Sequence, residues 1–140
     1  MRPIIITSIA IFAALTVSVA AKAQTPEEQR KAEKEFYESI DREKERLTDL
    51  LDLEDWQVFY VDSILTHDYK ALEEELQDLR NKKVSNADLY YEVQDRFKDK
   101  IYYAYQKIFD EKQWAKYLKS GAGREKQARE KKQAKAEAKK

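Results

Sequence analysis

Apolar side chains recur along the chain at the spacing of amphipathic helices. Residues 26–49 carry four of them among lysines and glutamates, one helical turn or two apart, which predicts a helix with one buried face. Thr25 and Glu28 form a capping box around Pro26, a residue favoured at the first helical position. The four apolar residues are Ala32, Phe36, Ile40 and Leu47.

Residues 54–80 predict a second helix that is apolar on two faces. At 100° per residue, one stripe falls within a narrow arc along the whole segment. A second stripe occupies the opposite side of the first half only. The first stripe consists of Val58, Val61, Leu65, Leu72, Leu76 and Leu79, and the second of Trp56, Tyr60, Ile64, His67 and Ala71.

The third predicted helix follows a turn at residues 81–86, where Ser85 and Asp88 can form its capping box. Six apolar residues project to one line along the helix. Aromatic residues beside this line widen the apolar arc to about half of the helix circumference, which is more than the ~100° that a surface helix needs. The line is Tyr90, Val93, Phe97, Ile101, Ala104 and Ile108, and the aromatic residues are Tyr91, Tyr102, Tyr105 and Phe109. These tyrosines can be ordinary core, but the width favours an interface or a binding surface.

A fourth helix is predicted to begin at Asp110 and to end at the glycines Gly121 and Gly123. Beyond them, residues 124–140 contain alanine as their only apolar residue, so this segment has no face to bury. The sequence thus predicts an all-α fold, a four-helix extended hairpin in residues 24–120 followed by a charged basic tail in residues 121–140.

The first 23 residues read as a signal peptide. Arg2 precedes a long run without ionisable residues, and Ala21 and Ala23 provide the small residues of a cleavage site. An uncleaved membrane anchor is the alternative, because the run approaches the roughly 20 residues that span a bilayer. The interpretation as a signal peptide predicts a soluble protein, periplasmic or otherwise exported, with no transmembrane segment after cleavage.

Charge is distributed unevenly over the predicted mature chain. Residues 24–123 hold 17 basic and 24 acidic residues, a net charge of −7, whereas residues 124–140 hold 8 basic and 3 acidic residues, a net charge of +5. Nucleic acid is not an expected partner, because export separates the protein from it and because glutamates interrupt the positive charge of the tail. The tail is expected to be solvated and partly helical.

Two short segments ahead of predicted helices are alike. Each has a bulky apolar residue, a capping position, and a glutamine three residues after the cap. As helix starts, they predict capping and packing roles for their residues. The key residues are Leu53 and Gln57 in the first segment, which has Glu54 at its cap, and Phe109, Asp110 and Gln113 in the second.

With its signal peptide, its helices and the absence of cysteine, the chain resembles the LTxxQ-motif periplasmic proteins, the family of Spy and CpxP. The resemblance covers residues 27–119, and Glu54 and Asp110 stand where that motif has threonine. It implies a bent helical hairpin that forms an antiparallel homodimer, and either ATP-independent binding of unfolded proteins or stress signalling in the envelope.

The sequence contains few residues that could form a catalytic or metal site. His67 is the single histidine and there is no cysteine, so a zinc site lacks ligands. Acidic pairs on the helices have no accompanying nucleophile, and the positions of both glycines near the C-terminus exclude nucleotide-binding loops. We therefore expect no catalytic residue, cofactor or metal.

The sequence predicts a binding protein for unfolded or envelope proteins; the alternative is an interaction protein that docks one fixed envelope partner. The residues expected to form the client or dimer surface are Trp56, Tyr60, Ile64, Tyr91, Tyr102, Tyr105 and Phe109.

Overall fold

The computed structural model describes residues 25–140, which contain helices and no strand. The prediction of an all-α fold is therefore confirmed for this part of the chain. The predicted signal peptide, residues 1–23, lies outside the described residues. Within the described part, no helix combines the length and the apolar character needed to cross a membrane.

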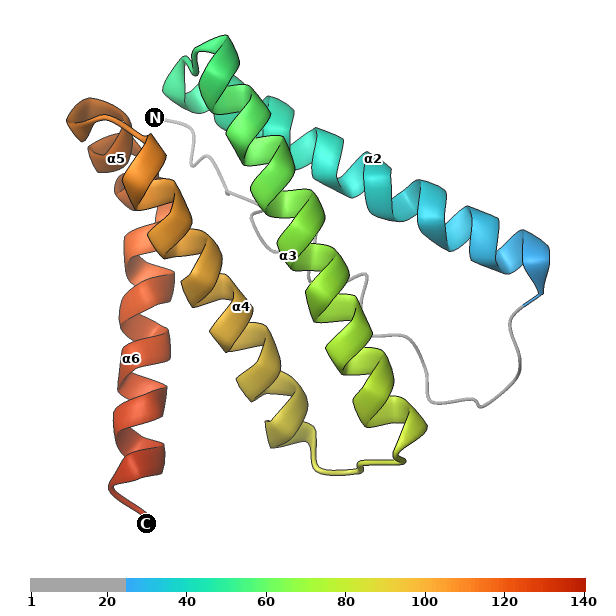
Figure 1. The fold of residues 1–140 in the computed structure, drawn as a ribbon. Coiled ribbons are helices and arrows are strands. Elements are labelled where there is room, and N and C mark those ends of the chain that lie inside the picture. Colours follow the sequence, from blue (N-terminus) through green and yellow to red (C-terminus); the bar gives the residue numbers. More distant parts are fainter. Residues whose placement is uncertain (1–24) are drawn as a thin grey trace, which may run out of the picture.

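Helix α2 (Pro26–Leu51) begins at the predicted capping box. The Glu28 amide donates to Thr25 Oγ1 over 3.2 Å, and the Thr25 amide donates to Glu28 Oε2 over 2.8 Å. The helix ends two residues later than predicted, because Leu51 is buried in the core and Asp52 closes the helix in the left-handed conformation. Its first turns are exposed, and Figure 1 shows them extending away from the other helices.

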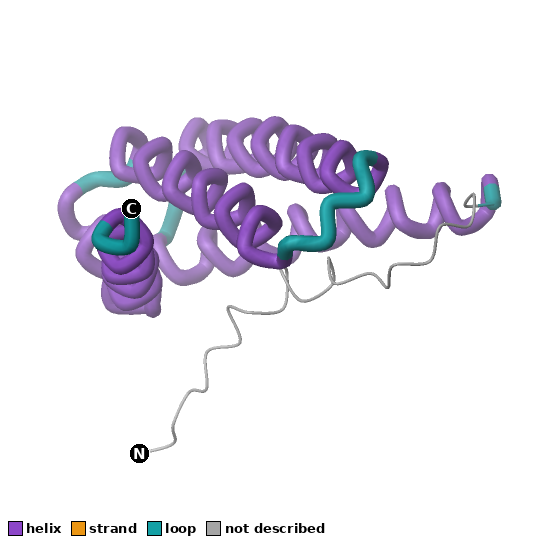
Figure 2. The backbone as a smooth tube through the Cα atoms, turned by 90° about the horizontal axis from the view of Figure 1, so that it is seen from below, coloured by secondary structure: helices purple, strands orange, loops and turns teal. Residues whose placement is uncertain are grey.

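Helices α3 (Asp55–Asn81) and α4 (Ala87–Ile108) form an antiparallel hairpin (Figures 1 and 2). The cap of α4 differs from the prediction: Asn86 Oδ1, rather than Ser85, accepts a hydrogen bond from the Asp88 amide over 3.0 Å. The Tyr90 hydroxyl donates to the Val84 carbonyl over 2.7 Å and ties α4 to the turn. The helix consequently starts one residue later than the predicted cap would place it.

The C-terminal quarter of the described chain is more ordered than predicted. A short helix, α5 (Glu111–Tyr117), leads through a π-helical turn (Leu118–Ala122) into α6 (Gly123–Glu137). Gly121 adopts a φ of 122° in this turn, a conformation that side-chain-bearing residues rarely adopt. In Figure 1, α6 runs back beside α4, so the segment predicted as a solvated tail packs on the body.

Two clusters of apolar side chains hold the helices together. The larger cluster joins α2, α3, α4 and the segment around α5, and the smaller one joins the far ends of α3 and α4. Tyr69 packs against both clusters and links them. The buried members are Ile40, Leu47, Leu51, Leu53, Val61, Leu65, Ile101, Tyr105 and Phe109 in the larger cluster, and Leu72, Leu76 and Phe97 in the smaller.

Candidate functional site

The two glutamines of the similar segments meet in the interior. Gln57 is 3% exposed and Gln113 is 8% exposed, and their side-chain amides form a reciprocal pair. Gln57 Nε2 donates to Gln113 Oε1 over 2.6 Å, and Gln113 Nε2 donates to Gln57 Oε1 over 2.9 Å. The start of α3 is thereby joined to the start of α5.

Each glutamine also connects two helix ends. Gln57 Nε2 donates to the carbonyl of Ile108, the last residue of α4, over 2.8 Å, and Gln113 Nε2 donates to the carbonyl of Leu51, the last residue of α2, over 3.3 Å. The oxygen of each glutamine accepts the amide of its own N-cap residue, Glu54 or Asp110, over 2.9 Å. Carbonyls at helix ends lack intrahelical partners, so this arrangement satisfies groups that the helices leave open.

This glutamine junction fixes the first turns of α3, which carry a group of exposed aromatic side chains. Trp56 is 50% exposed, Phe59 is 67% exposed and Tyr60 is 50% exposed. At 100° per residue these three residues point away from the buried stripe of α3, which contains Val61 and Leu65. We call the group formed by Trp56, Phe59 and Tyr60 the α3 aromatic surface.

The rings of this surface contact one another. Trp56 and Tyr60 lie edge to face with ring centroids 6.1 Å apart, and Phe59 and Tyr60 do so at 5.8 Å. The Trp56 indole N–H donates to Glu54 Oε2 over 2.6 Å, which orients the ring. Aromatic rings in these geometries attract one another, and a contiguous exposed apolar group is typical of an interaction site.

Phe59 and Tyr103, both strongly exposed, were not among the residues singled out from the sequence. Phe59 belongs to neither apolar stripe of its helix. Its position three residues after Trp56 was the available signal, because residues at this spacing share a helix face.

The other predicted surface residues lie in different environments. Ile64 is partly buried and packs against the larger core cluster. Tyr105 and Phe109 are buried in that cluster, where Tyr117 of α5 contacts both rings, with centroids 5.5 Å and 5.6 Å away. Within one chain, α5 therefore covers part of the wide apolar arc of α4, and these two side chains are inaccessible to a client.

Tyr91 and Tyr102 lie on the side of α4 that faces α6. The Lys126 ammonium lies 5.8 Å from the ring centroid of Tyr102, and that of Lys132 lies 5.2 Å from the ring centroid of Tyr91. Tyr102 also packs edge to face on Trp114, with ring centroids 4.9 Å apart. Tyr91 still exposes half of its surface, so the lysines of α6 cover this side of α4 only in part.

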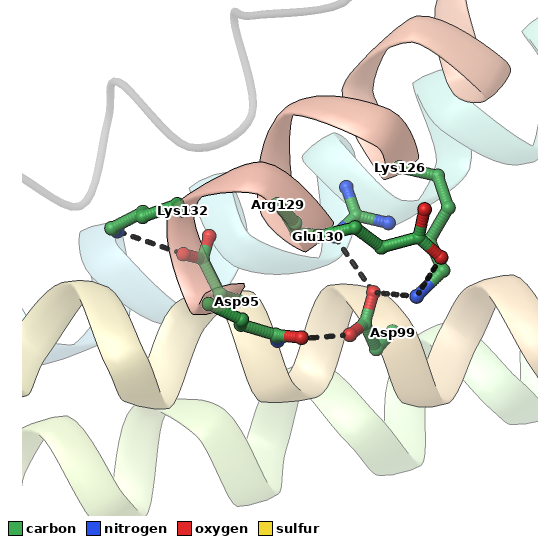
Figure 3. A network of polar contacts seen from close by, with 7 residues as sticks. Asp95, Asp99, Lys126, Arg129, Glu130 and Lys132 are labelled. Atoms are coloured by element: carbon green, nitrogen blue, oxygen red, sulfur yellow. Dashed lines mark hydrogen bonds and ion pairs between the residues drawn. The ribbon is translucent and has the colours of Figure 1, made fainter. Parts of the chain in front are cut away.

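Figure 3 shows the ion pairs that hold α6 on α4. Asp99 Oδ1 accepts from Arg129 Nε over 2.8 Å and from Lys126 Nζ over 3.3 Å, and Asp95 Oδ2 accepts from Lys132 Nζ over 2.8 Å. Burial alone would raise the pKa of Asp99, but hydrogen bonds and charge from Arg129 and Lys126 outweigh it and lower the pKa below the usual value. Both of these cations are buried, which corrects the expectation that the tail has no face to bury.

The described residues offer no constellation typical of a metal site. No group of three or more potential ligands among His, Cys, Asp and Glu lies together in residues 25–140. His67 is exposed, and its Nδ1 lies 2.9 Å from Asp68 Oδ1, which also contacts Lys100 Nζ over 3.2 Å. Asp68 is buried, and His67 and Lys100 provide partners for its carboxylate.

Any interpretation of function therefore depends on the fold and on the α3 aromatic surface, because comparison with known proteins finds no match. No protein-family model, no curated protein and no solved structure matches the chain.

Proposed function

We propose that this protein is an exported, ATP-independent binding protein that holds unfolded polypeptides on the α3 aromatic surface. The observation that supports this proposal is the exposure of three large aromatic side chains within two turns of one helix. Rings that stay exposed to water do not stabilise the folded chain, whereas burying them against a partner is favourable. An unfolded polypeptide presents the apolar side chains that this surface would cover.

The chemistry of the α3 aromatic surface suits a binder of many sequences. Aromatic side chains supply a large contact area and bury it without requiring one particular arrangement of polar partners. The three rings lie on the exposed face of one helix, so extended segments of different sequences can lie across them. Buried Gln57, hydrogen-bonded to α4 and α5, holds the start of α3 in place beneath this surface.

The proposal includes membership of the LTxxQ-motif periplasmic family and a homodimeric state. Both rest on the resemblance of the two glutamine-containing segments. Sedimentation equilibrium of the mature chain at micromolar concentration is expected to give twice the monomer mass, and a monomer at all concentrations would remove the dimer from the proposal.

Suppression of aggregation tests the proposed function. The mature protein is expected to slow the aggregation of two unrelated unfolded proteins, and the triple variant W56S/F59S/Y60S should lose most of this effect. The matched control is Tyr37→Ser with Leu89→Ser, which removes large exposed residues elsewhere on the surface. Equal protection by the triple variant and the control would show that clients bind another face.

A fixed partner is the second candidate, because the hydrogen bond from Trp56 to Glu54 and the edge-to-face ring contacts pre-order the surface. Pre-ordered aromatic groups are typical of specific interfaces. A pull-down from envelope extract separates the two functions, since an adaptor should retain one protein and a chaperone several unrelated ones.

A further inference from the structure

The cations of α6 lie on two different sides of the helix. Lys126 and Arg129 point toward α4, where both contact Asp99. At 100° per residue, three other cations fall within about 40° of one another on the side turned away from α4, and they extend along the helix for roughly 16 Å. These three residues, which we call the outer basic stripe, are Arg124, Lys131 and Lys135.

The two sides of α6 differ in their ion pairs. Lys126, Arg129 and Lys132 pair with carboxylates of α4, as Figure 3 shows. The three residues of the outer basic stripe are exposed, and within residues 25–140 they form no ion pair and no hydrogen bond through their side chains. Their positive charge is therefore available to a partner outside this part of the chain.

The glutamates of α6 do not interrupt this stripe. Along the sequence they alternate with the cations, but in the helix each of them lies about 80° or more from the nearest residue of the stripe. Lys139 and Lys140 follow the end of the helix and add positive charge beyond it. The three glutamates are Glu125, Glu130 and Glu137.

The thickness of α6 separates the outer basic stripe from the acidic body. Residues 24–123 contain 17 basic and 24 acidic residues, a net charge of −7, which would repel an anionic partner at short range. A helix with its side chains is about 10 Å thick, which is close to the Debye length at physiological ionic strength. An anionic partner on the outer side of α6 is thus close to the cations of the stripe and largely screened from the body.

We propose that the outer basic stripe binds the surface of a membrane that contains anionic phospholipids. Beyond its first residue, α6 has alanine as its only apolar residue type, so this face cannot supply the apolar core that protein interfaces contain. An anionic bilayer surface attracts basic segments through charge alone. The helix then lies along the headgroups without inserting into the bilayer, and this contact does not depend on client binding by the α3 aromatic surface.

Co-sedimentation with lipid vesicles tests this proposal. The mature protein is expected to bind vesicles of equal parts phosphatidylglycerol and phosphatidylcholine, but not vesicles of phosphatidylcholine alone. Raising the salt concentration from about 50 mM to about 500 mM should release it, because salt screens the attraction. Each cation at an anionic surface contributes about fivefold to binding, so R124Q/K131Q/K135Q should lower the partition coefficient about tenfold to 100-fold.

A charge-matched variant is the control. R30Q/K31Q/K34Q removes the same charge from the exposed first turns of α2, which Figure 1 shows extending away from α6, and should change the partition coefficient less than about threefold. Glutamine has a helix propensity close to those of lysine and arginine, so both variants should fold, which circular dichroism checks. W56S/F59S/Y60S should bind vesicles as the wild type does.

Four results would overturn the proposal. They are absence of binding to the anionic vesicles, equal binding to phosphatidylcholine alone, equal losses in R124Q/K131Q/K135Q and its charge-matched control, and loss of binding in W56S/F59S/Y60S. The last result would place the membrane contact on the α3 aromatic surface. Soluble polyglutamate is added as a second probe, and its binding by the stripe without any binding to vesicles would assign the stripe to an acidic polypeptide instead.

Discussion

Arg129 of α6 and Asp99 of α4 form an ion pair in which Arg129 Nε donates to Asp99 Oδ1 over 2.8 Å, with both side chains mostly buried. Because α6 has alanine as its only apolar residue type beyond its first position, polar contacts of this kind are what attach it to the body. Removing one partner of a buried pair leaves the other charge uncompensated and is destabilising.

Asp99→Asn is therefore expected to release α6. The free energy that holds α6 on α4 should fall by about 1–3 kcal/mol, since Arg129 and Lys126 both lose their carboxylate. Hydrogen exchange resolved to residues 123–137 measures this. Glu130→Gln is the control, because Glu130 is exposed and contacts Lys126 over 3.4 Å. Unchanged protection of α6 in Asp99→Asn would contradict the assigned role.

The same contact predicts a pH dependence. The pKa of Asp99 is lowered from the usual 3.8, so its charge stabilises the docked state above the unfolded pKa, and this contribution is lost as the pH falls through the lower, folded pKa. Protection of α6 should stay level between about pH 7 and pH 5 and decline below about pH 4. Asp99→Asn should show a smaller decline. An equal decline in both proteins would assign the effect to other carboxylates.

Gln113→Ala probes the glutamine junction. The substitution leaves the Gln57 amide and the Leu51 carbonyl short of a buried partner, so it should lower the free energy of unfolding by about 1–3 kcal/mol. Gln127→Ala, on the exposed side of α6, is the matched control and should cost less than about 0.5 kcal/mol. Chemical denaturation compares the two variants. Similar stabilities would mean that the junction is not an important contact.

Asp110→Ala separates capping from client binding. Asp110 Oδ1 accepts the Gln113 amide over 2.8 Å at the start of α5, and Asp110 is not one of the three residues of the α3 aromatic surface. Loss of this cap should lower stability by about 0.5–2 kcal/mol without changing the affinity of the folded protein for unfolded clients. Thermal unfolding and a binding titration on the same sample provide both values, and a large loss of affinity would make Asp110 part of the client surface.

Local periodicity was sufficient to predict helices α2, α3 and α4. The capping box at Thr25 and the apolar stripes of α3 and α4 correspond to helices within a few residues of the predicted limits. The docking of α6 was not predictable in this way, because it depends on Asp95 and Asp99 meeting cations more than 25 residues later in the chain. Helical periodicity carries no information on such pairing.

The candidate site was predictable only in part. Trp56 and Tyr60 were found because they form a second stripe opposite the core. Tyr105 shares the apolar arc of α4 with exposed neighbours, and its burial depends on Tyr117 in the seven-residue helix α5, which is too short for a clear periodic signal. The pairing of Gln57 with Gln113 similarly joins two helix starts that the sequence presents as independent.

Nuclear magnetic resonance of the two tryptophans tests the central claim most directly. Trp56 lies on the α3 aromatic surface, whereas Trp114 is partly buried against Tyr102 and Tyr117 and serves as an internal control. On titration with a permanently unfolded protein, the indole N–H signal of Trp56 should shift or broaden in a saturable way while that of Trp114 stays in place. Binding of the client with no change at Trp56 would contradict the claim that this surface holds unfolded polypeptides.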